Sequence, residues 1–399
     1  GGGFHYQIAE KMGKPLEMAV AVGGDPSLIL AAIMPLPEGL DEVAFSGIVR
    51  GQRTPLTKAK TLDMKVPAHA EFVFEGVLRP RVRRLEGPFG DHFGHYSAAG
   101  DHPVFEITRM THRKNAIYPA TVVGRPPQED RYLGDAAQLA LTPLMRLLRK
   151  EVKDMWAYYE AGFHNLLVVS VDPRYQREPI KTAMGLLGEG QLSLTKNLIL
   201  VGPDVNPRNY SQVMQAIRRN FDPEQDFHLL ARTAADTLDF TGEALHKGSK
   251  MILDATGGPL GEGAPTAVAL PANINAIAPG IVKHRLVGKT MLVVQTDGGG
   301  REIIQKLVDN PLLGSVKIVV AVSSDVDIDD DENLIWGIFT RFDAVLDVMF
   351  SRSEFRGIAP VYSGVLGIDA TWKQGYQKPL VMDPDVVKKV DAKWSRYWK

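Results

Sequence analysis

The chain has 399 residues, 23% of them charged, and a formal net charge of -1, an ordinary balance for a globular protein of two or more domains. A charge so close to zero argues against a broadly basic nucleic-acid-binding surface, and no apolar run approaches the roughly 18 residues that a membrane span requires. The absence of cysteine excludes disulfides, thiolate metal sites and cysteine nucleophiles, and it fits the cytoplasmic location that we expect.

The first third of the chain is rich in strand-forming residues. A helix is expected to end near residue 14, a strand at residues 18–22 closes in a turn, and a second helix follows at residues 27–33. Three further strands are expected at residues 71–77, 104–108 and 116–123. A barrel-like sheet is the natural arrangement for such segments.

Residues 86–91 (EGPFGD) place two carboxylates, Glu86 and Asp91, on either side of a turn rich in glycine and proline. A tight loop can aim both acids into one cleft, where each shifts the pKa of the other so that one donates a proton while its partner stays charged. The alternative is a surface turn that carries two acids. His92 and His95 follow, and they either bind a metal or have a structural role, because the glycines around them disfavour a regular helix.

Beyond residues 124–127 the pattern changes to that of an α/β protein. A helix is expected at residues 133–153, where leucines recur at helical spacing. Nearly continuous apolar strands then alternate with helices, which is typical of a buried parallel sheet. These strands are expected at residues 166–171, 198–201, 291–294 and 318–322.

The α/β part contains an internal repeat. Three pairs of segments match in order: 198–205 with 319–326, 217–222 with 338–343, and 252–256 with 367–371. We interpret them as a duplicated α/β unit joined by a connection rich in glycine, proline and alanine, and we expect the extra copy to serve scaffolding or assembly.

Three other candidate sites have simpler explanations. The acids of residues 325–332 resemble a calcium loop but lack its central glycine and terminal acid, so they indicate the start of a helix. Residues 297–300 (DGGG) lack the lysine of a phosphate loop and predict a tight turn. Asp41 is expected to cap a short helix that Glu42 begins.

The whole chain resembles the UbiD family of decarboxylases, which use prenylated flavin mononucleotide (prenylated FMN). The resemblance rests on the order and spacing of several segments. They are residues 20–26 (VAVGGDP), 34–38 (MPLPE), 41–51 (DEVAFSGIVRG), 66–76 (VPAHAEFVFEG), 86–96 (EGPFGDHFGHY), 116–118 (AIY), 124–127 (GRPP) and 367–371 (GIDAT).

This resemblance implies an α/β chain, α+β overall, in which a flavin-binding split β-barrel domain precedes a layered α/β assembly domain with an internal repeat. The expected parts are the flavin domain at residues 1–127, a linker helix at 128–160, the first α/β copy at 161–256, a connection at 257–287, and the second copy with a C-terminal tail at 288–399.

The resemblance also assigns site residues. Glu86 and Asp91 correspond to the two catalytic acids, Met34 and Pro35 to the segment that lines the cofactor, and Glu42 to a ligand of the Mn²⁺ or Mg²⁺ that bridges to the cofactor phosphate. A potassium ion is a further candidate. An arginine, an asparagine and a histidine that complete the family's site are expected in a segment before Gly1. Many members carry glutamate where this chain has Asp91, and the shorter side chain alters the geometry offered to the substrate.

The implied function is the reversible, non-oxidative decarboxylation of an aromatic or α,β-unsaturated carboxylic acid, with a link to menaquinone or ubiquinone biosynthesis. Asp91 would deliver the proton, and a negative substrate would raise its pKa. A homo-oligomer and a flavin prenyltransferase that supplies the cofactor are the expected partners. The alternatives are a non-catalytic scaffold or partner subunit of the same fold, and a flavin oxidoreductase, although the chain shows no dinucleotide fingerprint.

Overall fold

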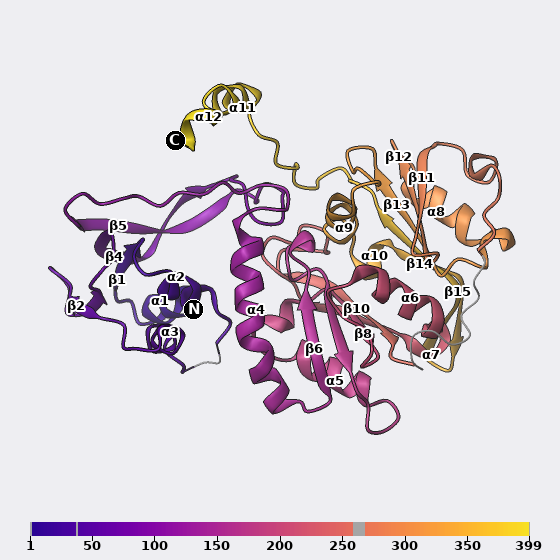
Figure 1. Cartoon of the computed structure of the whole chain (residues 1–399), viewed down its shortest axis with the longest axis horizontal. Coiled ribbons are helices and arrows are strands. Elements are labelled where there is room, and N and C mark those ends of the chain that lie inside the picture. Colours follow the sequence, from indigo (N-terminus) through magenta and orange to yellow (C-terminus); the bar gives the residue numbers. More distant parts are fainter. Residues whose placement is uncertain (1, 37–38, 258–267, 399) are drawn as a thin grey trace. The chain divides into compact units, whose positions relative to one another are not determined.

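A computed structural model describes residues 2–36, 39–257 and 268–398 of the chain (Figure 1). Its internal contacts divide it into two compact units. We call Gly1–Gly90 with Tyr96–Val122 the N-terminal unit, and Asp91–His95 with Val123–Lys399 the α/β unit. The mixed α/β class expected from the sequence is confirmed. None of the described helices combines the length and apolar character that a membrane crossing requires.

The N-terminal unit is built on a three-stranded antiparallel sheet in the order β1-β4-β5. A two-stranded ribbon, β2 with β3, and three helices complete its regular elements. The strands are β1 (Leu16–Val22), β2 (Leu56–Lys58), β3 (Lys65–Pro67), β4 (Phe72–Glu86) and β5 (Gly100–His112), and the helices are α1 (Gly2–Lys11), α2 (Pro26–Ile33) and α3 (Glu42–Arg50).

The cap of α3 follows the sequence prediction, and one predicted strand is wrong. Asp25 caps α2 and Asp41 caps α3, where the Asp41 carboxylate accepts a hydrogen bond from the Ala44 amide at 2.9 Å. Residues 116–123 form no strand and pair with no neighbouring strand. The Ile117 amide donates instead to the Glu71 carboxylate at 3.0 Å.

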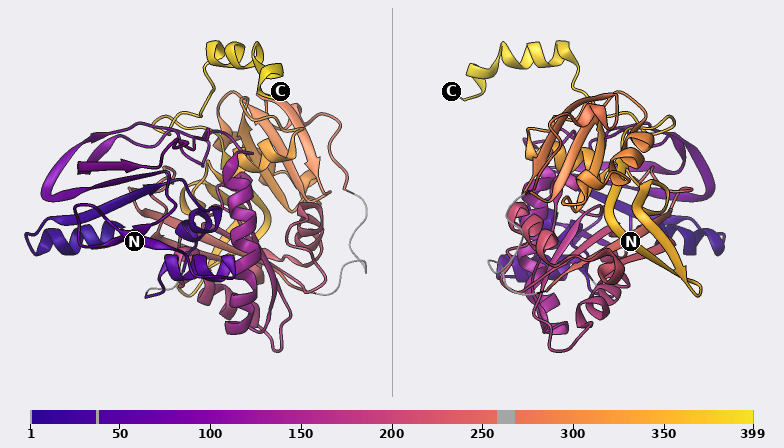
Figure 2. Two further views of the ribbon diagram at one scale, coloured as in Figure 1. Left: turned by 60° about the vertical axis from the view of Figure 1, so that its left-hand side comes forward. Right: turned by 90° about the vertical axis from the view of Figure 1, so that its right-hand side faces the viewer.

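The α/β unit contains two five-stranded sheets with the same strand order, β6-β7-β8-β10-β9 and β11-β12-β13-β15-β14. In each sheet the three central strands run parallel and both outer strands run antiparallel to their neighbours. Figure 2 shows the ribbon from two further directions. The strands are β6 (Val152–Ala157), β7 (Leu167–Val171), β8 (Asn197–Val201), β9 (Phe227–Ala234), β10 (Lys247–Ala255), β11 (Ile281–Val287), β12 (Met291–Thr296), β13 (Ile318–Ser323), β14 (Val348–Arg356) and β15 (Ala359–Ala370).

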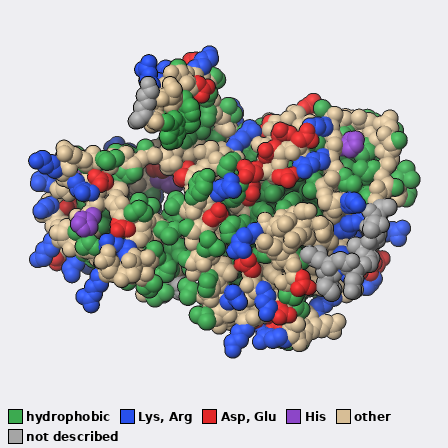
Figure 3. All heavy atoms as spheres, viewed as in Figure 1, with side chains coloured by type: hydrophobic (Ala, Val, Ile, Leu, Met, Phe, Trp, Pro, Cys, Tyr) green, Lys and Arg blue, Asp and Glu red, His purple; other side chains and the backbone are tan. Residues whose placement is uncertain are grey.

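Helices of the α/β unit precede the first sheet, lie between the strands and follow the second sheet. They are α4 (Glu129–Leu148), α5 (Glu178–Leu187), α6 (Tyr210–Asn220), α7 (Pro223–Asp226), α8 (Gly300–Val308), α9 (Asp331–Phe339), α10 (Ala344–Asp347), α11 (Pro384–Asp391) and α12 (Trp394–Tyr397), with short 3-10 turns at Tyr159–Ala161, Gly190–Leu194, Ile274–Ala276 and Pro311–Leu313. The acidic run starts α9, as expected, with Asp330 as its cap. Figure 3 shows acidic and basic side chains intermingled in this region, where Asp331 pairs with Arg285 at 2.7 Å.

The two sheets share side-chain details as well as strand order. The hydroxyl of Thr256 donates to Asp254 at 2.6 Å after β10, and that of Thr371 donates to Asp369 at the same distance after β15. A second matched pair, Asp222 and Asp343, caps the short helices α7 and α10. The matching geometry supports the duplication inferred from the sequence.

Two strands lie outside the copies that the sequence predicted. β6 falls in the expected linker helix of residues 128–160, where α4 already ends at Leu148, and β11 falls in the expected connection of residues 257–287. Residues 258–267 of that connection lie outside the described residues. Both strands are sheet edges with polar residues among the apolar ones, so they lack the continuous apolar run that marked the central strands.

The two copies share one hydrophobic core. Phe227 of β9 meets Phe350 of β14 edge to face, with ring centroids 4.8 Å apart. Asp343 of the second copy also accepts two hydrogen bonds from Ser249 of the first, from its amide at 2.9 Å and its hydroxyl at 2.6 Å. The copies therefore fold against each other as one body.

The matched caps Asp343 and Asp222 differ in the groups that they bond, and this difference predicts unequal losses of stability on substitution. Asp343 is buried and bonds Ser249, Val345 and Leu346, whereas the exposed Asp222 bonds the first turn of its own helix. We expect Asp343→Ala to lower the free energy of unfolding by about 3 kcal/mol and the matched Asp222→Ala by about 1 kcal/mol. Urea titrations of both variants measure the two losses, and equal losses would contradict the shared-core role of Asp343.

Candidate active site

The loop that carries both predicted acids is divided between the two units. Glu86 is exposed and ends β4 in the N-terminal unit. Gly90 and Tyr96, which flank the tip of the loop, pair with each other as a β-bridge in that same unit. The five residues between them, Asp91–His95, belong to the α/β unit. Glu86 and Asp91 therefore fall in different units.

Asp91 and His92 lie together at the start of a tight turn. The Gly94 amide donates to the Asp91 carbonyl at 3.0 Å, and the Asp91 amide donates to the His95 carbonyl at 3.3 Å. One carboxylate oxygen of Asp91, Oδ1, accepts from the His92 amide at 2.8 Å and lies 3.0 Å from His92 Nδ1. The other oxygen, Oδ2, accepts no hydrogen bond from the part of the chain that the structure describes.

This contact shifts the pKa values of both side chains. The hydrogen bond from His92 lowers the pKa of Asp91 in the free chain. The rise expected from the sequence assumed a negatively charged substrate near Asp91 and did not include His92. Burial lowers the pKa of His92, but the carboxylates of Asp91, Asp130 and Asp236 outweigh it and raise the pKa above its ordinary value. Asp91 and His92 thus each favour the charged form of the other, which draws the pKa of Asp91 down and that of His92 up.

His95 points away from this pair, into the α/β unit. It is 2% exposed and stacks on Trp336 with ring centroids 5.0 Å apart. Its Nδ1 donates to the Phe93 carbonyl at 3.0 Å, and its Nε2 accepts from Arg341 Nε at 3.4 Å, so one neutral tautomer satisfies both contacts. His92 and His95 do not converge on a common point, and the structural role expected for them stays the better explanation.

Arg341, which no sequence motif singled out, lies at the centre of these contacts. Its side chain is fully buried and makes two hydrogen bonds to Asp325, each 2.7 Å long. Burial and then the Arg341 charge lower the pKa of His95 to about 3, so His95 is neutral at physiological pH. A buried arginine has no local sequence signature, and only its spacing from the acidic run could have suggested a pairing.

Close packing leaves no spare space around the turn. Gly94 has a φ of +71°, and a Cβ added there would lie 2.6 Å from the Trp336 indole nitrogen. Gly162 faces the Phe93 ring, and a Cβ added there would lie 2.5 Å from a ring carbon. Both glycines are required where another segment approaches their backbone.

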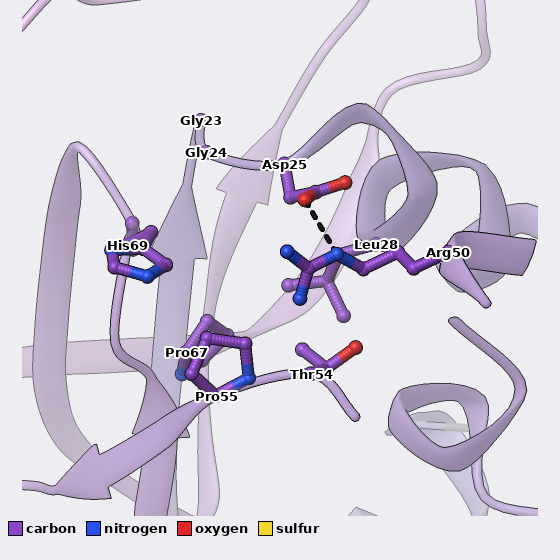
Figure 4. A pocket seen from close by; sticks show the side chains of 10 residues that line it. Gly23, Gly24, Asp25, Leu28, Arg50, Thr54, Pro55, Pro67 and His69 are labelled. Carbon is purple, nitrogen blue, oxygen red and sulfur yellow. Dashed lines mark ion pairs between the residues drawn. The ribbon is translucent and has the colours of Figure 1, made fainter. Parts of the chain in front are cut away.

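A pocket in the N-terminal unit gathers three of the sequence motifs (Figure 4). Its lining includes Gly23, Gly24 and Asp25 from the first motif, Arg50 from α3, and His69 from the segment before β4. Arg50 Nε pairs with the Asp25 carboxylate at 2.8 Å. Hydrogen bonds from the neighbouring serine and then the Arg50 charge hold the pKa of Asp25 below its usual range.

The residues expected to hold the cofactor and metal lie near this pocket in sequence but do not line it. Met34 is 5% exposed and caps α2, Pro35 is half-buried, and Glu42 is exposed in the first turn of α3. Pro37 and Glu38 of the same motif lie outside the described residues. In the described ranges, no three His, Asp or Glu side chains group as a metal site would require, so these residues do not complete one around Glu42.

Comparison with known proteins identifies two domains along the chain. A model of the 3-octaprenyl-4-hydroxybenzoate carboxy-lyase Rift-related domain matches residues 1–126, and the model of the C-terminal domain of the same carboxy-lyase matches residues 131–255 and 264–370. The matched residues include Glu86, Asp91 and Arg341.

Relatives and solved structures agree with these matches. A Chlamydia pneumoniae protein named as one of the subunits of 4-hydroxybenzoate decarboxylase is 37% identical over all of this chain, which spans 67% of that relative. The closed form of vanillic acid decarboxylase from Sedimentibacter hydroxybenzoicus is 30% identical, with a TM-score of 0.62 over 68% of this chain and 57% of that one. HmfF from Pelotomaculum thermopropionicum, a UbiD-class enzyme solved with FMN, is 27% identical, with a TM-score of 0.56 over 68% of this chain and 60% of that one.

The neutral state of His95 predicts a pH dependence of stability. The unfolded chain binds a proton at His95 below its ordinary pKa of 6.5, while the folded chain resists protonation down to about 3. Stability should therefore fall with decreasing pH in this window, by up to about 1.4 kcal/mol per pH unit from this one residue.

His95→Gln removes the contribution of His95 to this pH dependence. Urea titrations at pH 7, 6 and 5 should therefore show a shallower loss of stability for the variant than for the wild type. His284→Gln, at an exposed position in the same unit, is the matched control and should keep the wild-type slope. Parallel curves for wild type and His95→Gln would show that His95 does not resist protonation.

Proposed function

This chain belongs to the UbiD family of carboxy-lyases, and we propose that it catalyses the non-oxidative, reversible decarboxylation of an aromatic carboxylic acid. The observation that carries the proposal is the match of both family domains in order along the chain, with Glu86 and Asp91 inside the first. The names of its relatives, which refer to 4-hydroxybenzoate and to vanillic acid, favour a phenolic acid as the substrate. An α,β-unsaturated acid is the wider alternative.

In this proposal Asp91 delivers a proton to the carbon that has lost carbon dioxide. Its Oδ1 is engaged by His92, whereas Oδ2 accepts nothing from the described residues and is the oxygen suited to carry the proton. In the free chain the hydrogen bond from His92 lowers the pKa of Asp91, so the acid must be protonated when the substrate is in place. A negatively charged substrate nearby would provide that shift. Glu86 would orient the site.

The proposed cofactor is prenylated FMN, which supplies an electrophile and electron sink when bound. Met34 and Pro35 are the residues we propose for its binding, and Glu42 for one ligand of Mn²⁺ or Mg²⁺, whose oxygen preference a carboxylate meets. The described residues offer Glu42 no companion ligands, so we derive no step through the metal or through a potassium ion. A flavin prenyltransferase would supply the cofactor.

We place the reaction in quinone biosynthesis and the protein in a cytoplasmic homo-oligomer. A non-catalytic partner subunit is the main rival, and the naming of the chlamydial relative as part of a larger enzyme favours it to some degree. The organised turn around Asp91 and His92 favours the enzyme, because a scaffold has no need for a carboxylate with one uncommitted oxygen.

The test is turnover by the chain produced together with a flavin prenyltransferase. We expect carbon dioxide release from 4-hydroxybenzoic or vanillic acid and an absorbance spectrum of bound modified flavin. Asp91→Asn should lower kcat by roughly 100-fold or more, the usual contribution of a proton donor, and leave the flavin spectrum unchanged.

Asp204→Asn is the control for the same chemical change at an exposed position of the α/β unit, and it should keep wild-type turnover. Normal turnover by Asp91→Asn would assign the proton to another group. A wild-type chain that binds no flavin and releases no carbon dioxide would favour the partner subunit.

A further inference from the structure

The tip of the catalytic loop is held by a part of the chain that lies far away in sequence. The Phe93 carbonyl accepts from the Trp336 indole N–H at 2.9 Å, a bond that spans 243 positions. The Gly94 carbonyl accepts from the Leu380 amide at 2.9 Å, and His95 forms a β-bridge with Pro379. The backbone of the turn is thus fixed by hydrogen bonds to residues of the second α/β copy and the segment after it.

Two guanidinium groups lie close to the ring of Trp336. Arg125 and Arg341 each place their central carbon 4.5 Å from the centroid of its ring. Asp325 pairs with both arginines, with Arg341 through two bonds of 2.7 Å and with Arg125 at 3.6 Å. The indole that donates to Phe93 is therefore fixed in position by charged groups as well as by packing.

Asp91 is connected rigidly to this anchored backbone. Its carbonyl accepts from the Gly94 amide and its amide donates to the His95 carbonyl, so the turn closes on itself. Phe93, 2% exposed, and His95, 2% exposed, fill the space beneath it. A shift of Trp336 or Arg341 would move the turn and with it the carboxylate of Asp91.

The internal duplication shows that the fold does not require these two anchors. The offset of 121 residues that aligns 198–205 with 319–326 and 217–222 with 338–343 places Gln215 opposite Trp336 and Asn220 opposite Arg341. The first copy forms the same five-stranded sheet with those residues. At these aligned positions only the second copy has the tryptophan and the arginine. The first copy also contacts the loop, through Gly162 beside Phe93 and Phe240 beside His95, but the indole hydrogen bond to Phe93 comes from the second copy.

We propose that Trp336 and Arg341 are positioning residues that set the orientation of Asp91, so the second copy of the α/β duplication has a role in catalysis besides assembly. The inference rests on the proposed function for the role of Asp91, whereas the anchoring itself does not depend on it.

Hydrogen exchange of the full chain without cofactor tests the anchoring. Trp336→Phe keeps an aromatic ring and removes the N–H that Phe93 accepts, while Arg341→Lys keeps the charge and removes the paired bonds to Asp325. Each variant should raise the exchange rate of the amides of residues 91–95 by about tenfold, as expected for the loss of a buried hydrogen bond. Exchange elsewhere in the unit should stay the same.

Trp156→Phe is the matched control, because Trp156 lies in the same unit and also stacks on an arginine, Arg208 at 4.6 Å, but not on the loop. It should leave the exchange of residues 91–95 unchanged. Protection of these amides within twofold of wild type in both Trp336→Phe and Arg341→Lys, with the chain folded by circular dichroism, would overturn the proposal.

Kinetics of the flavin-loaded chain on 4-hydroxybenzoic acid then test the consequence for Asp91. We expect Trp336→Phe to lower kcat about tenfold with KM unchanged and to raise the solvent deuterium isotope effect on kcat, because proton delivery becomes slower. Faster exchange at residues 91–95 with kcat and the isotope effect unchanged would refute the positioning role. A wild-type chain without turnover would count against the proposed function, and the exchange data would still decide the anchoring.

Discussion

A guanidinium withdrawn from water must be neutralised where it lies, and Arg341 imposes this constraint on everything around it. Its desolvation is costly, and the two bonds to Asp325 compensate only because their geometry is good. The residues around Arg341 meet this requirement. Asp325, just after β13, supplies the opposite charge, Trp336 packs on the guanidinium, and His95 stays neutral beside it. The turn that bears Asp91 is held in position because His95, which belongs to the turn, packs against Arg341 and Trp336.

The duplication explains how such a set could arise in an otherwise ordinary α/β layer. Both copies keep the carboxylates that close their strands and cap their short helices, such as Asp254 with Asp369. These groups satisfy backbone amides and are needed wherever the fold is built. Because these carboxylates stabilise each copy, positions 336 and 341 and their equivalents in the first copy are available for other contacts. Only the second copy has a tryptophan and an arginine there that contact the loop.

The sequence predicted much of this fold because its central strands are continuous apolar runs and helices such as α3 and α9 begin at capping aspartates. The strands that it missed include β6 and β11, whose edge positions leave them polar, and it assigned a strand to residues 116–123, where the Ile117 amide bonds the Glu71 side chain instead. The resemblance pointed to Asp91, but local pattern could not show that His92 engages it or that Arg341 lies beside His95. Contacts such as the one that spans 243 positions depend on tertiary packing, which no local periodicity records.

The contact between Phe93 and Gly162 has a consequence for how this protein can change. No side chain fits at position 162 while the phenyl ring occupies the adjoining space, and the ring cannot shrink without leaving a void beneath the turn. A smaller residue at position 93 would make room for a side chain at position 162, but the φ of +63° at Gly162 would still strain its backbone. Changes at Phe93, in the loop that carries the acid, should therefore restore only part of the stability that a substitution at Gly162 removes.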